Sequence, residues 1–329
     1  MAVTVETAES AALTPAQARV RAELLDIGGE RPTFDRALRD RLLAELDDGV
    51  APLLEGLPAA GAWRRGDKAL VVLGKRALDG VHQCERHYFA TDGEPFAWTA
   101  ATARGVVAHK ALELGAQHRQ PTPPATLVDL AIDRLRDEPW GPSGWLGTAT
   151  PDEIAQLRSA ATDVVTKFAD TFPPLPVKWK PRFESRLRLP LADGRVELTG
   201  KVDLVLGQAT GDQARVLLID LKTGSPSHSH PADLRFYALL EAVRCGVPPF
   251  RVASYYLDSA TWHAEDVDED VLAVTVRRVV DGLATVIDLR ARRRPPRESP
   301  GPLCRYCPVR PECEPGLAYT EPDVWAEGP

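Results

Sequence analysis

Hydrophobic residues recur at helical spacing in several stretches of the chain. Leucines three and four positions apart predict helices within residues 15–56, and comparable spacing predicts a helix over 151–172. Further helices are expected over 99–118 and 231–245, and a long one over 267–294 ends in a cluster of arginines. These segments supply the helical part of the expected fold.

Between the helices the pattern changes to the two-residue period of strands. Residues 177–191 and 195–206 alternate apolar and polar positions, and Asp193-Gly194 between them predicts a hairpin turn. A nearly continuous apolar run at 214–221 is typical of a strand covered on both faces, and 250–258 predicts another strand. The expected fold class is therefore α/β, a small mixed sheet flanked by helices.

Local composition divides the chain into three regions. Residues 57–67 are rich in glycine, proline and alanine, which is typical of a linker. The last part of the chain is rich in proline and holds three of the five cysteines. We expect a helical N-terminal region at 1–65, an α/β core with a helical insertion at 66–299, and a cysteine tail at 300–329.

Overall composition narrows the class of protein. The 329 residues are 44% hydrophobic and 26% charged, as in ordinary globular proteins. No apolar run is long enough for a membrane span, and the N-terminus lacks the pattern of a signal peptide, so we expect a cytoplasmic protein without a membrane partner. The net charge of −7 disfavours non-specific coating of nucleic acid but is compatible with a local basic groove.

Two acids interrupt the apolar strand segments. Asp203 ends the sequence Gly-Lys-Val-Asp, and Asp220 begins the sequence Asp-Leu-Lys-Thr-Gly. Buried, unpaired carboxylates are unfavourable, and a shared cation such as Mg²⁺ or Mn²⁺ would neutralise both. Lys222 lies two residues after Asp220, on the same face of the strand. This spacing suits metal-assisted hydrolysis of a phosphodiester, although an isolated Asp-x-Lys also occurs as an ordinary salt bridge.

These residues resemble the PD-(D/E)XK nuclease superfamily, which has the restriction endonuclease-like fold. The resemblance is closest to its RecB-like branch, which includes AddB nucleases and CRISPR-associated adaptation exonucleases. That branch carries Gly-x-x-x-His on a helix, Gly-x-x-Asp and Asp-x-Lys-Thr-Gly at two strands, and Gln-x-x-x-Tyr on a further helix. The matching positions, in chain order, are Gly105, His109, Asp203, Asp220, Lys222 and Tyr237.

The resemblance implies a metal site and a catalytic lysine. His109, Asp203 and Asp220 would bind Mg²⁺ or Mn²⁺, the carbonyl of Leu221 would complete the metal shell, and Lys222 would be catalytic. His109 shares a helix face with apolar neighbours, and a lone histidine there also occurs as an ordinary core residue.

Further residues are implied to support this site or to contact DNA. Glu184, on the preceding strand, matches a frequently acidic position of the family and is expected to be catalytic, as are Asp203 and Asp220. Tyr237 would support the site. Asp233 stands four residues before it, where the family usually has glutamine, and this departure bears on the DNA contact rather than on the metal. Arg293 and Arg294, within the arginine cluster, are expected at a phosphate-contacting rim, with a solvated helix end as the alternative.

The cysteine tail has the spacing Cys-x2-Cys-x5-Cys, formed by Cys304, Cys307 and Cys313. A closed metal centre needs a fourth ligand, for which Cys84 is the candidate. Iron–sulfur nucleases of the RecB-like branch have this layout, so the resemblance implies a 4Fe–4S cluster held by these four cysteines. Zinc is the alternative, although a zinc site usually takes two Cys-x2-Cys pairs. Cys245 is expected to be a small buried residue.

Taken with the resemblance, the chain is expected to be a metal-dependent DNA nuclease. An exonuclease acting on single-stranded DNA or DNA ends, in DNA repair, recombination or CRISPR-type defence, is the preferred interpretation. No Walker loop is present, so any unwinding would come from a helicase or CRISPR adaptation partner. The alternatives are a non-catalytic iron–sulfur DNA-binding or scaffold subunit, and a binding protein whose cysteines hold zinc. The intact set of Asp203, Asp220 and Lys222 favours the enzyme.

Overall fold

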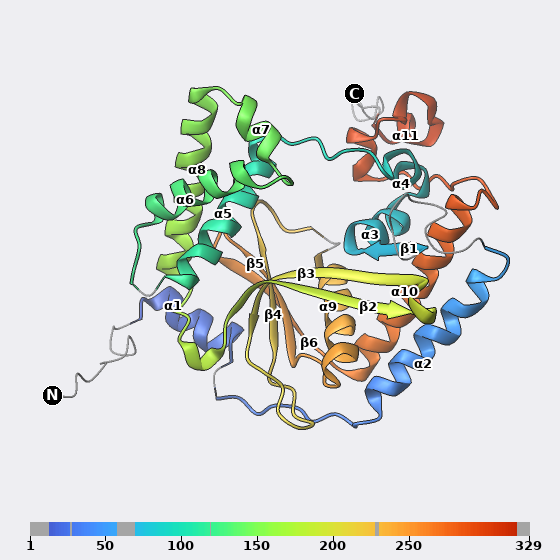
Figure 1. Ribbon diagram of the computed structural model, residues 1–329, viewed down its shortest axis with the longest axis horizontal. Coiled ribbons are helices and arrows are strands. Elements are labelled where there is room, and N and C mark those ends of the chain that lie inside the picture. Colours follow the sequence, from blue (N-terminus) through green and yellow to red (C-terminus); the bar gives the residue numbers. More distant parts are fainter. Residues whose placement is uncertain (1–12, 27, 58–69, 119, 228–229, 321–329) are drawn as a thin grey trace, which may run out of the picture.

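The structure is a computed structural model that describes residues 13–26, 28–57, 70–118, 120–227 and 230–320 (Figure 1). Most of the expected linker and the ends of the two terminal regions lie outside these residues. No helix in the described ranges is long and apolar enough to cross a membrane.

Six strands form one mixed sheet at the centre (Figure 1). Their order is β1-β3-β4-β5-β6, and β2 pairs with β3 as well. β1 and β5 run parallel to the strands they join, β3 and β4 respectively, and the other pairs are antiparallel. The strands are β1 (Val71–Gly74), β2 (Arg182–Leu191), β3 (Val196–Leu206), β4 (Leu217–Lys222), β5 (Arg251–Tyr256) and β6 (Thr261–Asp266).

Helices cover the sheet in two layers, one on either side in Figure 1. The first layer comprises α2 (Leu38–Val50), α3 (Lys75–Gln83), α9 (His230–Cys245) and α10 (Glu269–Arg290). The second comprises α1 (Pro15–Arg19), η1 (Val20–Leu24), α5 (Ala100–Gln117), α6 (Pro124–Asp137), α7 (Ser143–Thr148) and α8 (Pro151–Thr171). Each layer encloses its own hydrophobic core against the sheet. The mixed sheet flanked by helices is thus confirmed.

The remaining short elements lie in the connections and in the tail. They are η2 (Ala51–Leu54), α4 (Glu85–Thr91), η3 (Val177–Trp179), η4 (Ala192–Gly194), η5 (Pro302–Tyr306), η6 (Arg310–Glu312) and α11 (Glu314–Thr320). The cysteine tail packs beside α4, more than 200 residues earlier in the chain (Figure 1).

The hairpin between β2 and β3 is confirmed, because Asp193 and Gly194 adopt left-handed backbone angles in its turn. The strand expected from residue 177 begins only at Arg182, however. Val177–Trp179 form a 3-10 turn and Lys180 is also left-handed, with φ 48°. The turn and the left-handed Lys180 interrupt the extended backbone, and Pro181 has no N–H to pair, which explains the later start.

Several elements were not predicted from the sequence. Among them are helices α3 and α4, on either side of Cys84, and helix α6. Another is β6, which pairs with β5 at the sheet edge and has few apolar residues. An edge strand with one partner and an open face carries little hydrophobic pattern, which is why the sequence did not indicate it.

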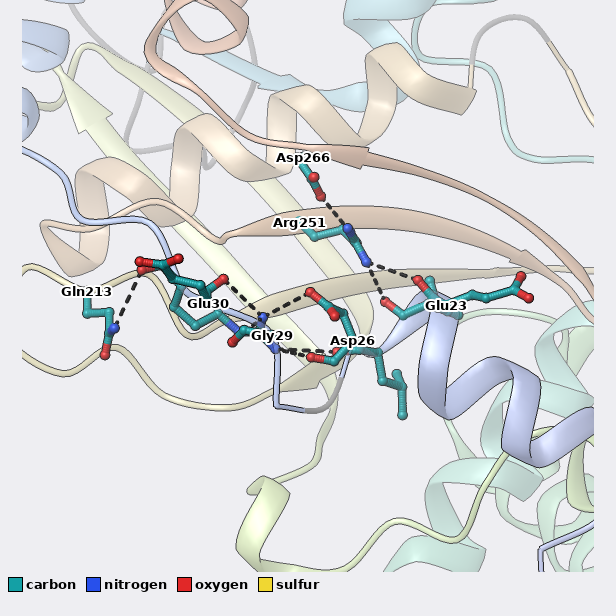
Figure 2. A network of polar contacts seen from close by, with 10 residues as sticks. Glu23, Asp26, Gly29, Glu30, Gln213, Arg251 and Asp266 are labelled. Carbon is teal, nitrogen blue, oxygen red and sulfur yellow. Dashed lines mark hydrogen bonds and ion pairs between the residues drawn. The ribbon is translucent and has the colours of Figure 1, made fainter.

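The described N-terminal residues are attached to both layers. Leu24 and Leu25 are buried in the second core, whereas the leucines of α2 are buried in the first. Polar contacts at the sheet edge hold the segment that connects the two layers. Figure 2 shows Arg251 of β5 pairing with Asp266 of β6 at 2.5 Å while donating to the backbone carbonyl of Glu23 at 3.1 Å.

An aromatic stack joins α8 to the sheet, and its loss tests the second core. The Phe172 ring stacks on Phe168 at 4.7 Å and meets the edge of Tyr255 at 5.2 Å. We expect Phe172→Ala to lower the free energy of unfolding by about 3–5 kcal/mol in chemical denaturation, because it leaves a cavity. Val177→Ala, at a side chain that is 90% exposed, should change it by less than about 0.5 kcal/mol. Equal effects would contradict this packing.

Candidate active site

Two buried carboxylates lie side by side where β3 meets β4. Leu204 pairs with Ile219, so the register continues to Asp203 opposite Asp220. Asp203 is 8% exposed and Asp220 is 2% exposed. Asp203 Oδ2 accepts the backbone N–H of Leu221 at 2.7 Å, which fixes its carboxylate against β4. The acids predicted from the sequence are therefore brought together.

Helix α5 presents His109 to this pair. Its ring Nδ1 lies 3.4 Å from Asp203 Oδ1. Burial would lower the pKa of His109, but the charge of Asp203 outweighs it and raises that pKa above its usual range. Conversely, burial would raise the pKa of Asp203, and the charge of His109 holds it below its usual range. The helix approaches closely because Gly105 has no side chain, since a Cβ there would lie 2.9 Å from Thr223 Oγ1.

Glu184 completes a cluster from a third element. The pairing of Phe183 with Leu204 and of Ser185 with Val202 places it opposite Asp203. Its backbone is left-handed, with φ 51°, a conformation that is uncommon for a non-glycine residue. One ligand atom each from His109, Glu184 and Asp203 lie within 4.8 Å of one another, in a group suited to a metal ion.

Asp220 does not belong to that group of three and instead faces lysines. Lys222 Nζ lies 2.5 Å from Asp220 Oδ2 and 3.8 Å from Asp233 Oδ2. The first contact lacks hydrogen-bond geometry, so Asp220 Oδ2 has no hydrogen-bond partner within the described part of the chain. The structure thus places the Lys222 ammonium beside the buried carboxylate of Asp220.

Lys75 is a site residue that the sequence analysis missed. It is the first residue of α3, and its Nζ lies 3.4 Å from Asp220 Oδ1 and 3.5 Å from Asp233 Oδ2. Burial would lower its pKa, but Asp220 and nearby groups raise it above the usual range for lysine. Only the tertiary fold shows that the end of β1 lies beside Asp220.

Tyr237 supports this second cation. The Lys75 ammonium lies 5.4 Å from the centre of the Tyr237 ring. Burial raises the pKa of the Tyr237 hydroxyl above its usual range, so the ring stays neutral. Gly200 allows the tyrosine to reach the sheet, because a Cβ at Gly200 would lie 2.8 Å from the ring. Asp233 contacts both Lys75 and Lys222. Its carboxylate offsets their positive charge, which the neutral side chain of a glutamine could not do.

A salt-bridged clamp holds the two walls of the site together. Arg104 of α5 donates two hydrogen bonds to Asp258, at 2.9 and 2.8 Å. The same carboxylate accepts the N–H of Gly224, just after Lys222, at 2.6 Å. One acid thus joins the helix of His109 to the strand of Lys222.

The four predicted cysteine ligands line one enclosed cavity beside α4. Cys84 comes from the junction of α3 and α4, and Cys304, Cys307 and Cys313 come from the tail. Cys245 lies apart, and its thiol donates to Glu241 at 3.2 Å. Its burial was predicted wrongly, since it is exposed at the end of α9.

The arginine cluster is engaged in contacts within the protein. Arg294 pairs with Glu85 of α4 at 2.5 Å, and Arg293 donates to the carbonyl of Glu55 at 3.3 Å. Arg290 pairs with Asp92 at 3.0 Å. These contacts join α10 and the tail to α4. A phosphate-contacting role for Arg293 and Arg294 stays a prediction, and their observed partners are all protein groups.

The mixed sheet lies between two helical layers and brings two acids, a histidine and a lysine together. The family model described as PD-(D/E)XK nuclease superfamily matches residues 76–314, more than half of the chain. The protein belongs to this superfamily. The resemblance noted from its motifs is thereby confirmed at the level of the superfamily.

Solved structures show more distant similarity. A candidate exonuclease from Eubacterium rectale is 10% identical with a TM-score of 0.45, over 73% of this chain and 87% of that one. The protein SSO0001 is 15% identical with a TM-score of 0.30, over 63% of this chain and 94% of that one. A comparison with curated protein sequences finds no match.

Asp258→Asn tests the clamp. We expect it to lower the free energy of unfolding by about 1–2 kcal/mol near neutral pH, because two charge-assisted bonds from Arg104 are weakened at a partly exposed site. Burial would raise the pKa of Asp258, but Arg104 and Gly224 hold it below its usual range. The stabilisation is therefore present above the ordinary carboxyl pKa and is lost as the pH falls through the lowered value.

Asp129→Asn is the matched control for this clamp. Asp129 forms a comparable bidentate pair with Arg158, but both side chains are 47% exposed. Its loss should lower the free energy of unfolding by less than about 1 kcal/mol. Denaturant titrations at several pH values measure both variants. A larger loss for Asp129→Asn than for Asp258→Asn would contradict the clamp.

Proposed function

We propose that the protein is a divalent-metal-dependent DNA nuclease, an exonuclease acting on single-stranded DNA or DNA ends. The observation that supports this most strongly is the meeting of His109, Glu184 and Asp203 beside the Asp220–Lys222 pair. Membership of a nuclease superfamily adds that phosphodiester hydrolysis is the reaction this arrangement serves in related folds. DNA repair, recombination or CRISPR-type defence is the proposed setting, with a helicase or adaptation complex as partner.

The donor set fits a hard divalent cation such as Mg²⁺ or Mn²⁺. His109, Glu184 and Asp203 would hold it, and the neighbouring carboxylate of Asp220, which ion-pairs with Lys222, is a further candidate ligand. A carbonyl contribution from Leu221 remains part of the proposal. When bound, the ion would polarise the phosphate and lower the pKa of its water. The resemblance implied His109, Asp203 and Asp220 as metal ligands and Glu184 as a catalytic group. The set proposed here counts Glu184 as a ligand as well.

Two lysines supply fixed positive charge beside Asp220. Lys222 is held by Asp220 and Asp233, which leaves its ammonium in place without rearrangement. Lys75 approaches the same acids from α3. Both charges would stabilise negative charge that develops on the phosphate, and Lys222 would orient the attacking water. Lys222 is the proposed catalytic lysine and Lys75 a second electrostatic group.

The cysteine cavity is proposed to hold a 4Fe–4S cluster. Cys84, Cys304, Cys307 and Cys313 all line it, which would give the four thiolates that such a cluster needs. Their one-plus-three arrangement along the chain differs from the two Cys-x2-Cys pairs of a usual zinc site and supports a cluster rather than one ion. Gly316 closes the cavity, because a Cβ there would lie 3.2 Å from Cys313 Sγ and 3.7 Å from Cys304 Sγ.

A non-catalytic DNA-binding or scaffold subunit is the second candidate. It would keep the cysteine cavity but would not need the metal group, both buried acids and the lysines. Retaining buried charges without a function is unfavourable, because apolar replacements are often at least as stable. The complete site therefore favours the enzyme.

Lys222→Ala should abolish cleavage. We expect a loss of at least about 100-fold in the Mn²⁺-dependent cleavage rate of end-labelled DNA, because a preorganised charge near the phosphate is removed. The control is Lys180→Ala, whose exposed side chain contacts Gln208 at 2.5 Å in another part of the sheet. Product lengths on single-stranded and duplex substrates give the polarity. DNA binding by wild-type protein with no cleavage in Mg²⁺ or Mn²⁺ would favour the scaffold subunit instead.

Cys84→Ser and Cys245→Ser distinguish the cluster from zinc. Anaerobically purified wild-type protein and Cys245→Ser should each contain about four irons per chain with a broad visible absorbance. Cys84→Ser should lose iron and absorbance, because it removes one of four cavity thiolates. Elemental analysis measures iron and zinc together. Stoichiometric zinc without iron, or equal iron in Cys84→Ser, would overturn the cluster assignment.

A further inference from the structure

One face of the β1–β3–β2 part of the sheet is open and borders the active site. The buried side chains of these strands alternate with exposed ones, so Leu187 and Leu198 face the first core whereas Arg186 and Lys201 face outward. A groove runs across this outward face from Arg188 to Asp203 and Lys75. It ends at the candidate metal site.

Cations line this groove in a regular arrangement. Arg186 and Lys201 are directly opposite each other across the β2–β3 ladder, and Arg188 is opposite Thr199 one step further out. A two-residue step along a strand is about 7 Å, so the Arg186–Lys201 pair lies one step from Glu184 and Asp203. The cationic rows thus form a track that leads away from the acids.

The pairing of like charges points to an anionic ligand. Cross-strand like charges are unfavourable in the free protein. Lys201 is partly compensated by an ion pair with Glu184, but Arg186 has no ion-pair or hydrogen-bond partner among the residues that the structure describes. Arg188 has only a 3.6 Å contact with Glu197 and a side chain 67% exposed. Phosphate groups of a chain would match these positions.

Aromatic rings adjoin the same groove. Arg76 lines it and stacks on the Phe96 ring at 5.3 Å. Phe96 meets Trp98 edge-on at 4.8 Å and is 44% exposed, although a large apolar ring is normally covered. Cationic grooves combined with exposed aromatic rings bind single strands, because unpaired bases stack on the rings while phosphates follow the cations.

We propose that this outward face is a binding track for single-stranded DNA, with Arg186 and Arg188 holding backbone phosphates and Phe96 stacking on an unpaired base. The inference rests on the proposed nuclease function and extends it, since it names the form of the substrate and its path to Asp203. A duplex offers its phosphates but not its base faces, so the aromatic contact selects the single strand.

The test measures binding without cleavage. A fluorescein-labelled single-stranded oligonucleotide is titrated in EDTA with wild-type protein, with Arg186→Ala/Arg188→Ala and with Phe96→Ala, and affinity is read by fluorescence anisotropy at several salt concentrations. The control is Arg21→Ala/Arg134→Ala, which removes two exposed arginines from η1 and α6, neither of which lines the groove. Thermal unfolding confirms that every variant is folded.

The two groove variants should differ in kind. Arg186→Ala/Arg188→Ala should weaken binding at least tenfold and reduce the slope of log K against log salt by about 1.4, since each single-strand phosphate contact contributes about 0.7. Phe96→Ala should weaken single-strand binding about tenfold, leave that slope unchanged and leave binding of a blunt duplex unchanged. The control should match wild type.

Other outcomes separate this inference from the proposed function. If the arginine variant binds with the affinity and salt slope of the control, the track is wrong, even where Lys222→Ala has abolished cleavage. If Phe96→Ala weakens duplex and single strand equally, the base contact is wrong. If the variants lose binding as expected but the wild-type protein does not cleave DNA, the track is supported and the nuclease proposal fails.

Discussion

The burial of Asp203 beside Asp220 is the constraint on which the rest of the site depends. Two adjacent carboxylates in the middle of a sheet are unfavourable unless cations or hydrogen bonds compensate them. Here the compensation comes from His109 on α5, Lys222 on β4 and Lys75 on α3. If α5, β4 or α3 moved, the acids would lose one of these compensating charges. The positions of the three elements are therefore coupled to this one pair of acids.

The course of β3 explains how buried acids remain accessible. β1 pairs with Val196–Thr199, and β4 pairs with Leu204–Leu206 on the same path through the sheet. Asp203 lies between these two ladders, where β3 exchanges one partner for the other. Lys75 follows immediately after β1 and reaches Asp220 across this junction. The change of partner thus opens the sheet at the acids while the helices keep both cores closed.

Much of this site was predictable, for a definite reason. Asp203, Asp220 and Lys222 interrupt apolar strands, and a charge in such a place requires a partner, so the local pattern was sufficient. In the sequence, Gly105 and Gly200 were identified only as parts of motifs. The structure shows why glycine is needed at each, because Thr223 and Tyr237 approach these positions closely. Lys75 was not predictable in this way, because it follows an ordinary short strand and its role depends on which strand β1 joins.

Helix α3 connects the two chemical centres of the protein. Lys75 begins it, and Cys84 follows its last residue directly. A helix of nine residues is about 13 Å long and nearly rigid, so its two ends move together. Cys84 lies in the cysteine cavity, and its neighbour Glu85 pairs with Arg294, which follows α10. The proposed cluster at the cysteines would therefore also fix the axis of α3 and the distance of Lys75 from Asp220. A structural cluster at one end of this helix would act on cleavage at the other through position alone, with no transfer of electrons.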